Sequence, residues 1–251
     1  MKKLFIFFPL LFLFACKKDY RSIYNYVDAT NNAYVKLVHA VPNALATPTS
    51  STQAGLQVYL GNTKITGANV TYGGGVYPGL EYALVPSGNL SLKAVIPAGT
   101  SNPEIAVVNA PVTLSAGKFY TAVITDTIPT ASFFLIEENF SPVADSGKYF
   151  VRLVNATPKS GAYDLYGVTD VATIASNIQY KSASAFTQIF VGTGSRTFAI
   201  RKPGTTTNIA TVAITPTPGR MYSILSYGID GATGLRAPKV TFFTSRFQSP
   251  Q

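Results

Sequence analysis

The chain has 251 residues, of which 47% are hydrophobic and only 12% charged, and 20 Lys and Arg against 11 Asp and Glu give a net charge of +9 at pH 7. This composition excludes charge-driven disorder, collagen and a charge-rich coiled coil. Long solvent-facing helices need more charged residues on their wet sides, so many short strands are favoured.

The first 15 residues have the pattern of an export signal. Lys2 and Lys3 supply a positive start, and the uncharged run over residues 4–15 contains five Phe. A helix over this run reaches about 18 Å, well short of the roughly 30 Å of bilayer hydrocarbon. We therefore predict a signal peptide over residues 1–15 rather than a spanning anchor.

The signal ends on Leu13-Phe14-Ala15-Cys16, which resembles a bacterial lipobox, and Cys16 is the only cysteine of the chain. The resemblance implies that Cys16 becomes a lipid-modified N-terminus carrying several acyl chains. At about 0.8 kcal/mol per buried CH₂ such chains anchor firmly. It also implies a location in the bacterial cell envelope, with the outer membrane favoured, and makes residues 16–32 the lipidated N-terminus and its polar tether.

After the tether the chain contains two copies of one module. Val35-Lys36-Leu37-Val38-His39-Ala40-Val41-Pro42 reappears 116 residues later as Val151-Arg152-Leu153-Val154-Asn155-Ala156-Thr157-Pro158. Further matches in the same order pair residues 58–59 with 165–166, 69–72 with 177–180, 85–88 with 191–194, and 117–121 with 219–223. We predict one domain over 33–145 and a second over 146–251, joined at 141–147, each with its own core.

Within each copy, short runs rich in β-branched and aromatic residues alternate with Gly, Pro and Asn, and these runs predict strands. In the first copy they cover residues 34–40, 56–60, 69–72, 82–85, 90–96, 105–108, 118–125 and 132–137. In the second they cover residues 149–156, 163–166, 178–180, 187–191, 197–201, 209–214, 221–227 and 240–243. Seven or eight short strands in roughly 100 residues are typical of a β-sandwich, so we predict an all-β protein of two tandem sandwiches.

Four sequence patterns of the first copy together resemble DUF4397, a domain-of-unknown-function family of bacterial envelope proteins that often occurs in tandem. They are the opening V-K-L-V-H-A-x-P, the following x-V-Y-x-G, the turn L-V-P-S-G and the closing L-x-A-G-K-x-Y-T. The resemblance covers nearly the whole mature chain. It implies an immunoglobulin-like or transthyretin-like sandwich and an envelope location, and it brings no catalytic residues with it.

Residues able to do chemistry are few. His39 is the only histidine, and its repeat equivalent is Asn155, so we expect an imidazole or an amide to hold the His-Ala-x-Pro corner by hydrogen bonds. Glu137 and Glu138 are neighbours on a strand and point to opposite faces, which predicts a solvated strand end rather than an acid pair. With one His and one Cys, we predict no metal, no cofactor and no catalytic residue.

The segment from Tyr72 to Tyr82 is the one candidate ligand surface. Its glycine run over residues 73–75 has no following helix, which argues against a phosphate site. Tyr72, Tyr77 and Tyr82 could instead form an aromatic face that stacks on a sugar ring. Tyr77 and Tyr82 have no aromatic counterpart that can be aligned in the second copy, and Tyr77 is expected to lie in a loop.

Tyr120 and Tyr222 follow the same turn in the two copies, so we assign both to the sandwich cores. Lys and Arg are dispersed along the chain, which favours a solvated basic surface over nucleic-acid binding. Three functions remain open. The leading one is a non-enzymatic adhesion, spacer or scaffold lipoprotein; the second is a glycan-binding accessory protein of an outer-membrane uptake system; the third is an envelope hydrolase built around His39. The predicted partners are the membrane, through the lipid, and a glycan or an envelope protein.

Overall fold

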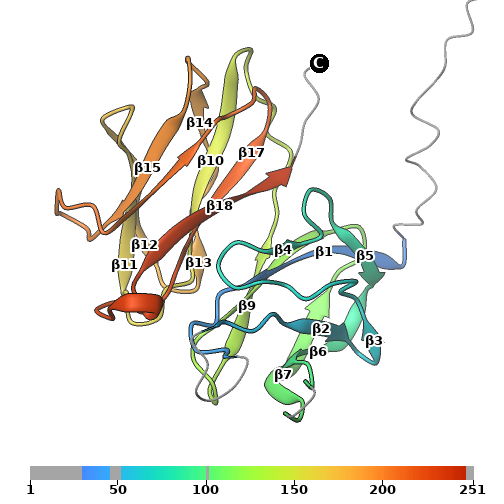
Figure 1. The fold of residues 1–251 in the computed structure, drawn as a ribbon. Coiled ribbons are helices and arrows are strands. Elements are labelled where there is room, and N and C mark those ends of the chain that lie inside the picture. The colour runs from blue at the N-terminus through green and yellow to red at the C-terminus, as the bar shows by residue number, and fades with distance from the viewer. Residues whose placement is uncertain (1–29, 46–51, 100–101, 247–251) are drawn as a thin grey trace, which may run out of the picture.

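The computed structural model describes residues 30–45, 52–99 and 102–246, and these residues form strands, turns and one 3₁₀ turn, η2 (Gly234–Arg236). We call the first sequence copy, with strands β1 to β9, module 1, and the second, with β10 to β18, module 2. Figure 1 shows module 2 at the upper left and module 1 at the lower right. The all-β prediction is confirmed within the described residues.

Module 1 is a sandwich of two sheets. One has the order β4-β1-β8-β9, with β5 pairing β1, and the other has the order β3-β2-β6-β7. The bounds of its strands are β1 Asn32–His39, β2 Gln57–Leu60, β3 Thr63–Lys64, β4 Val76–Tyr77, β5 Ala83–Pro86, β6 Gly88–Ile96, β7 Ile105–Leu114, β8 Phe119–Thr125 and β9 Ser132–Glu137.

Module 2 repeats this topology strand for strand. One sheet has the order β13-β10-β17-β18, with β14 pairing β10, and the other has the order β12-β11-β15-β16. The bounds of its strands are β10 Lys148–Asn155, β11 Ala162–Gly167, β12 Ala172–Gln179, β13 Ser182–Ala183, β14 Thr187–Phe190, β15 Arg196–Arg201, β16 Ala210–Ile214, β17 Met221–Tyr227 and β18 Lys239–Arg246. The register agrees too, since Val35 lies beside Tyr120 in a parallel pair and Val151 lies beside Tyr222 in the equivalent pair.

The strand predicted over residues 69–72 is wrong. Val70 makes only an isolated bridge to Leu56, and the strand of this region is β4, which pairs with β1. Between them the chain turns tightly, because a Cβ on Gly75 would stand 2.3 Å from the Thr71 hydroxyl oxygen and Gly73 has a φ of 71°. The propensity of the run Val70 to Tyr72 is overridden by this turn.

Each sandwich encloses an apolar cluster of its own. In module 1 the cluster includes Leu37, Leu56 and Tyr120, and in module 2 it includes Leu153, Phe198 and Tyr222. The predicted core positions of Tyr120 and Tyr222 are confirmed, since these residues are 5% and 3% exposed.

The two core tyrosines also make the same hydrogen bond. The Tyr120 hydroxyl accepts from the Ser115 backbone N–H at 3.2 Å, and the Tyr222 hydroxyl accepts from the Thr217 N–H at 3.0 Å. A buried tyrosine that bonds the backbone a few residues upstream resembles the tyrosine corner of immunoglobulin-type sandwiches.

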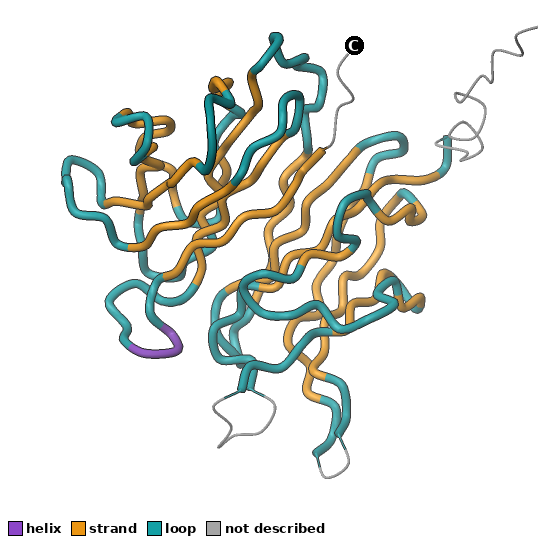
Figure 2. Tube along the Cα trace, turned by 45° about the horizontal axis from the view of Figure 1, so that its top comes forward, coloured by secondary structure: helices purple, strands orange, loops and turns teal. Residues whose placement is uncertain are grey.

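A third apolar cluster lies between the modules. It joins Val38, Ala40 and Val123 of module 1 to Val154, Ala156, Leu225 and Phe243 of module 2. The four sheets therefore stack as four layers, and Figure 2 shows the two inner sheets facing each other. This explains why β1, β8, β10 and β17 are almost continuously buried: each is covered on both faces.

Polar contacts also cross this interface. The Thr125 hydroxyl donates to the Ala156 carbonyl at 2.7 Å, and the Lys181 ammonium pairs with the Asp126 carboxylate at 2.7 Å. Each copy thus encloses an apolar cluster of its own, and the copies also share a buried surface that the strand pattern alone does not reveal.

Candidate functional site

His39 and Asn155 occupy equivalent corners at the ends of β1 and β10. His39 is fully buried; its Nδ1 accepts from the Val41 N–H at 3.2 Å, and its Nε2 lies 3.1 Å from the Ala54 carbonyl oxygen. Asn155 copies the first bond with its Oδ1, which accepts from the Thr157 N–H at 3.2 Å. Both ring nitrogens of His39 therefore form hydrogen bonds that hold the corner. This arrangement requires the neutral imidazole with its proton on Nε2.

This burial makes His39 a source of acid sensitivity. Desolvation lowers the pKa of His39 from 6.5 to about 4. Between pH 6.5 and pH 4, His39 binds a proton in the unfolded chain but stays neutral in the folded protein. The free energy of unfolding should therefore fall by about 3 kcal/mol as the pH drops from 6.5 to 4. We expect His39→Asn, which imitates module 2, to remove this share of the pH dependence. Denaturant titrations of parent and variant at several pH values measure it, and equal slopes would contradict the assignment.

The structure places Tyr72 and Tyr77 in different surroundings. The Tyr72 ring packs edge-on against His39 and Tyr227, with centroids 5.6 and 5.2 Å away, and burial raises the pKa of its hydroxyl. Tyr77 lies in β4 opposite Leu37 and packs against the module 1 core. The expectation of a loop position for Tyr77 is wrong.

Tyr82 lies in a third place, on the side of β1 and β8 that faces module 2. Its ring contacts Phe119 and Phe140 edge-on, at 5.3 and 5.7 Å, and covers the Lys36 ammonium at 4.8 Å. Its hydroxyl lies 3.4 Å from that of Thr121. The three tyrosines of the predicted ligand surface therefore do not share one aromatic face.

Tyr82 does have an aromatic counterpart, which sequence alignment alone missed. Ala83 pairs with Val35 of β1, and Thr187 pairs with the equivalent Val151 of β10, so the preceding residues, Tyr82 and Phe186, correspond. Sequence alignment missed this match because the segments before Tyr82 and Phe186 differ in length. Only the strand register brings the two residues into correspondence.

Under these two rings lie two buried cations. Lys36 is fully buried, and its ammonium donates to the carbonyl oxygens of Leu80 and Thr244, both at 3.0 Å, and of Gly79 at 3.4 Å. Desolvation lowers its pKa from 10.5 to about 8. Lys36 thereby ties a loop of module 1 to β18 of module 2.

Arg152 is the equivalent cation of module 2, and it has an ionic partner. Its Nη2 donates to Glu138 Oε1 at 2.6 Å, its Nε donates to the Ser223 hydroxyl at 2.7 Å, and its guanidinium stacks on Phe186 at 4.3 Å. The two charged side chains are 4% and 0% exposed, and Thr121 also donates to Glu138 Oε1 at 2.5 Å.

The prediction of a solvated strand end holds for Glu137 and is wrong for Glu138. The two do point to opposite faces: Glu137 is exposed and pairs with Lys118 at 2.9 Å, whereas Glu138 turns inward to Arg152. Sequence reasoning missed the Arg152–Glu138 pair because Glu138 directly follows the last residue of β9 and its carboxylate meets Arg152 only when the modules pack.

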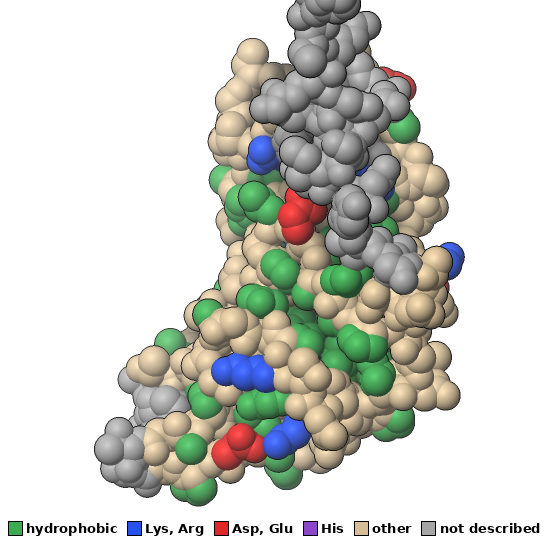
Figure 3. Space-filling model, turned by 90° about the vertical axis from the view of Figure 1, so that its right-hand side faces the viewer, with side chains coloured by type: hydrophobic (Ala, Val, Ile, Leu, Met, Phe, Trp, Pro, Cys, Tyr) green, Lys and Arg blue, Asp and Glu red, His purple; other side chains and the backbone are tan. Residues whose placement is uncertain are grey.

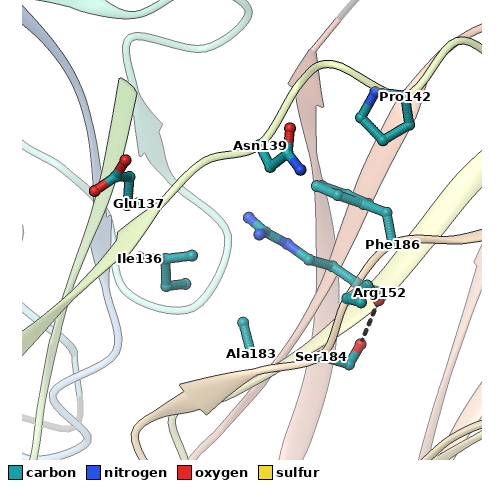
Figure 4. Close-up of a pocket in the computed structure, with 9 residues that line it drawn as sticks. Ile136, Glu137, Asn139, Pro142, Arg152, Ala183, Ser184 and Phe186 are labelled. Atoms are coloured by element: carbon teal, nitrogen blue, oxygen red, sulfur yellow. Dashed lines mark hydrogen bonds between the residues drawn. The ribbon is translucent and has the colours of Figure 1, made fainter. Parts of the chain in front are cut away.

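A cleft of about 270 Å³ opens beside this pair, at the joint between the modules. Figure 4 shows the Arg152 guanidinium pointing into it between Ile136 and Asn139, with the Phe186 ring beside the Arg152 side chain. The cleft is lined by Ile136, Glu137, Asn139, Pro142, Arg152, Ala183, Ser184, Ala185 and Phe186. It is the candidate functional site.

Comparison with protein families decides where the chain belongs. The model of the domain of unknown function DUF4397 matches residues 33–166 and, in a second segment, residues 149–240. The chain belongs to the DUF4397 family. The two matches agree with the tandem repeat seen in the sequence and in the fold.

Other comparisons add little about this DUF4397 protein. Among solved structures it is similar to CBMbc, a family CBM26 module of Eubacterium rectale Amy13K crystallised with maltoheptaose. The identity is 12%, the TM-score is 0.26, and the match covers 87% of this chain and 98% of that one. A TM-score of this size carries no argument about ligand or function. No curated protein sequence matches the chain.

The Lys and Arg side chains of this DUF4397 protein are dispersed, as in the sequence. On the face seen in Figure 3 they lie apart from one another, around a patch of hydrophobic side chains. Some are also paired with acids: Arg196 pairs with Asp170 at 3.0 Å, and Lys202 pairs with Asp230 at 2.8 Å.

Two further observations concern metals and membranes. Within the described ranges, no three His, Cys, Asp or Glu side chains stand close enough to hold a metal ion. Among the same residues, no helix has the length and apolar character needed to cross a bilayer. Cys16, the predicted lipidation site, lies outside the described residues.

Proposed function

We propose that this DUF4397 protein is a lipid-anchored envelope protein that acts without catalysis as a spacer, adhesion or scaffold element. The observation that carries the proposal is the shared interface, in which an apolar cluster and the buried Arg152–Glu138 pair fuse two modules into one four-layer body. A body of this kind keeps its two outer sheets at a set separation, whereas two modules on a free linker would not.

The rigidity can be tested directly, because the sequence contains no cysteine besides Cys16. In residues 17–251, cysteines introduced at exposed Thr113 on β7 and exposed Ala213 on β16 would carry spin labels on the two outer sheets. We expect a single narrow distance distribution by pulsed electron resonance. A broad distribution would show that the modules move independently and would remove the basis for a spacer.

The anchor depends on Cys16. A Cys16→Ser variant should lose its acyl chains and leave the membrane fraction, since acyl burial supplies the binding free energy. Fractionation of cells that express parent or variant, with mass spectrometry of the mature N-terminus, measures this. Equal membrane retention of the two proteins would reject both the lipid anchor and the envelope location inferred from it.

The two other functions predicted from the sequence have less support. A glycan platform made of Tyr72, Tyr77 and Tyr82 lacks a common aromatic face, because each ring packs against different residues. A hydrolase built around His39 would need a free ring nitrogen, and both nitrogens already hold the corner.

A further inference from the structure

The two modules differ in one loop beside their buried cations. In module 1, four residues, 78–81, separate β4 from Tyr82, whereas in module 2 the register leaves only Ala185 between Ser184 and Phe186. In module 1 this loop supplies the Gly79 and Leu80 carbonyl oxygens that accept from Lys36. Module 2 lacks the loop, and the cleft of Figure 4 lies at the position that such a loop would cover.

The missing loop leaves hydrogen-bond donors at the cleft. Arg152 uses Nε and Nη2, and among the described residues its Nη1 has no protein acceptor. Asn139 uses Oδ1 to accept from the N–H and hydroxyl of Ser141, at 3.0 and 2.6 Å, so its Nδ2 is the group left for a ligand. Both side chains line the cleft, and in the view of Figure 4 the Asn139 amide and the Arg152 guanidinium point toward the same space.

We propose that this cleft binds a neutral sugar unit of a glycan, whose hydroxyl oxygens accept from Arg152 Nη1 and Asn139 Nδ2. Adjacent hydroxyls of a sugar ring present the two acceptors that the missing loop carbonyls would have presented. Ile136, Pro142 and Phe186 supply apolar walls for the C–H face of the ring. About 270 Å³ lies just below the usual range of ligand pockets, which limits the bound part to one or two rings.

The charges around the cleft favour a neutral ligand over an anionic one. The guanidinium of Arg152 is compensated by the buried Glu138 carboxylate at 2.6 Å, and the Glu137 carboxylate lines the rim. Because Arg152 is already paired with Glu138 and Lys118 with Glu137, neither cation offers uncompensated positive charge to an added anion. A hydroxyl group brings no net charge and can also donate to Glu137.

The test uses the full chain purified in detergent and saturation-transfer NMR, which observes the sugar. The probes are maltose, cellobiose and diacetylchitobiose at millimolar concentration, with glucuronate as the anionic comparison. We expect saturation transfer to at least one neutral disaccharide, and at least tenfold weaker binding of glucuronate. Absence of transfer to all three disaccharides, or equal binding of glucuronate, would overturn the proposal.

Variants at Ala185 locate the site without touching Arg152. Replacing Ala185 by the four residues Pro-Gly-Leu-Glu of the module 1 loop, or making Ala185→Tyr at this exposed position, should fill the cleft and abolish transfer. Ala213→Tyr adds the same bulk at an exposed position of β16, outside the cleft lining, and should bind as the parent does. An unchanged thermal unfolding midpoint confirms that the filled variants fold, and sugar binding that persists in folded, filled variants would place the ligand elsewhere and refute the cleft.

Discussion

Arg152→Ala is expected to lower the free energy of unfolding by about 3–5 kcal/mol, because it leaves the Glu138 carboxylate buried without a counter-charge. Glu138 is 0% exposed at its side chain, and its Oε2 has no hydrogen-bond partner even with Arg152 in place. The remaining donor to Oε1, the Thr121 hydroxyl, cannot balance a full charge. Chemical denaturation of parent and variant measures the loss.

Two controls separate charge from packing. The double variant Arg152→Met with Glu138→Gln should recover most of the loss, since no uncompensated charge then remains at the interface. Lys93→Ala breaks the Lys93–Glu104 pair, whose side chains are 39% and 44% exposed, and should cost under about 1 kcal/mol. If Arg152→Ala alone lowers the free energy of unfolding by as little as Lys93→Ala does, water must reach Glu138 and the interface is not closed.

Tyr120→Ala should lower the free energy of unfolding by about 3–5 kcal/mol, through lost apolar contacts and the cavity left in the module 1 core. Tyr120→Phe keeps the ring and removes only the hydroxyl that accepts from Ser115 N–H, so it should cost about 1 kcal/mol. Denaturant titration of both variants tests the assignment.

Tyr77 supplies a comparison within the same module. Because Tyr77 packs partly buried against the core from the short strand β4, Tyr77→Ala should cost more than an exposed loop substitution and less than Tyr120→Ala. If Tyr120→Ala is no more costly than Tyr77→Ala, the central position of Tyr120 in the core is wrong.

The strand predictions are accurate where a run of residues has a clear strand pattern of its own. The residues of β8, β9 and β17 were predicted almost to their ends, because each run is apolar, β-branched or aromatic and is bounded by turn residues. The prediction over residues 69–72 failed because the glycine turn at 73–75 and the pairing of Val76 with Val38 determine where that strand begins. The pairing of β4 with β1, which are far apart in the sequence, cannot be derived from the residues of either strand alone.

The sequence by itself determined the two-copy organisation, the all-β class, the core positions of Tyr120 and Tyr222, and the shared corner of His39 and Asn155. These follow from local pattern and from repetition, since what both copies keep is what the common fold needs.

Only the tertiary structure decided that the outward faces of the two inner sheets cover each other. Lys36 and Arg152 interrupt apolar strands, but the groups that satisfy their charges lie elsewhere in the chain. Lys36 donates to carbonyl oxygens of a loop and of β18, and Arg152 pairs with the carboxylate of Glu138, which follows β9 in the other module. The cleft beside Arg152 exists because one loop is shorter, and that difference becomes visible only through strand register. Contacts between groups far apart in the chain depend on how whole sheets pack, and no local run of residues specifies that packing.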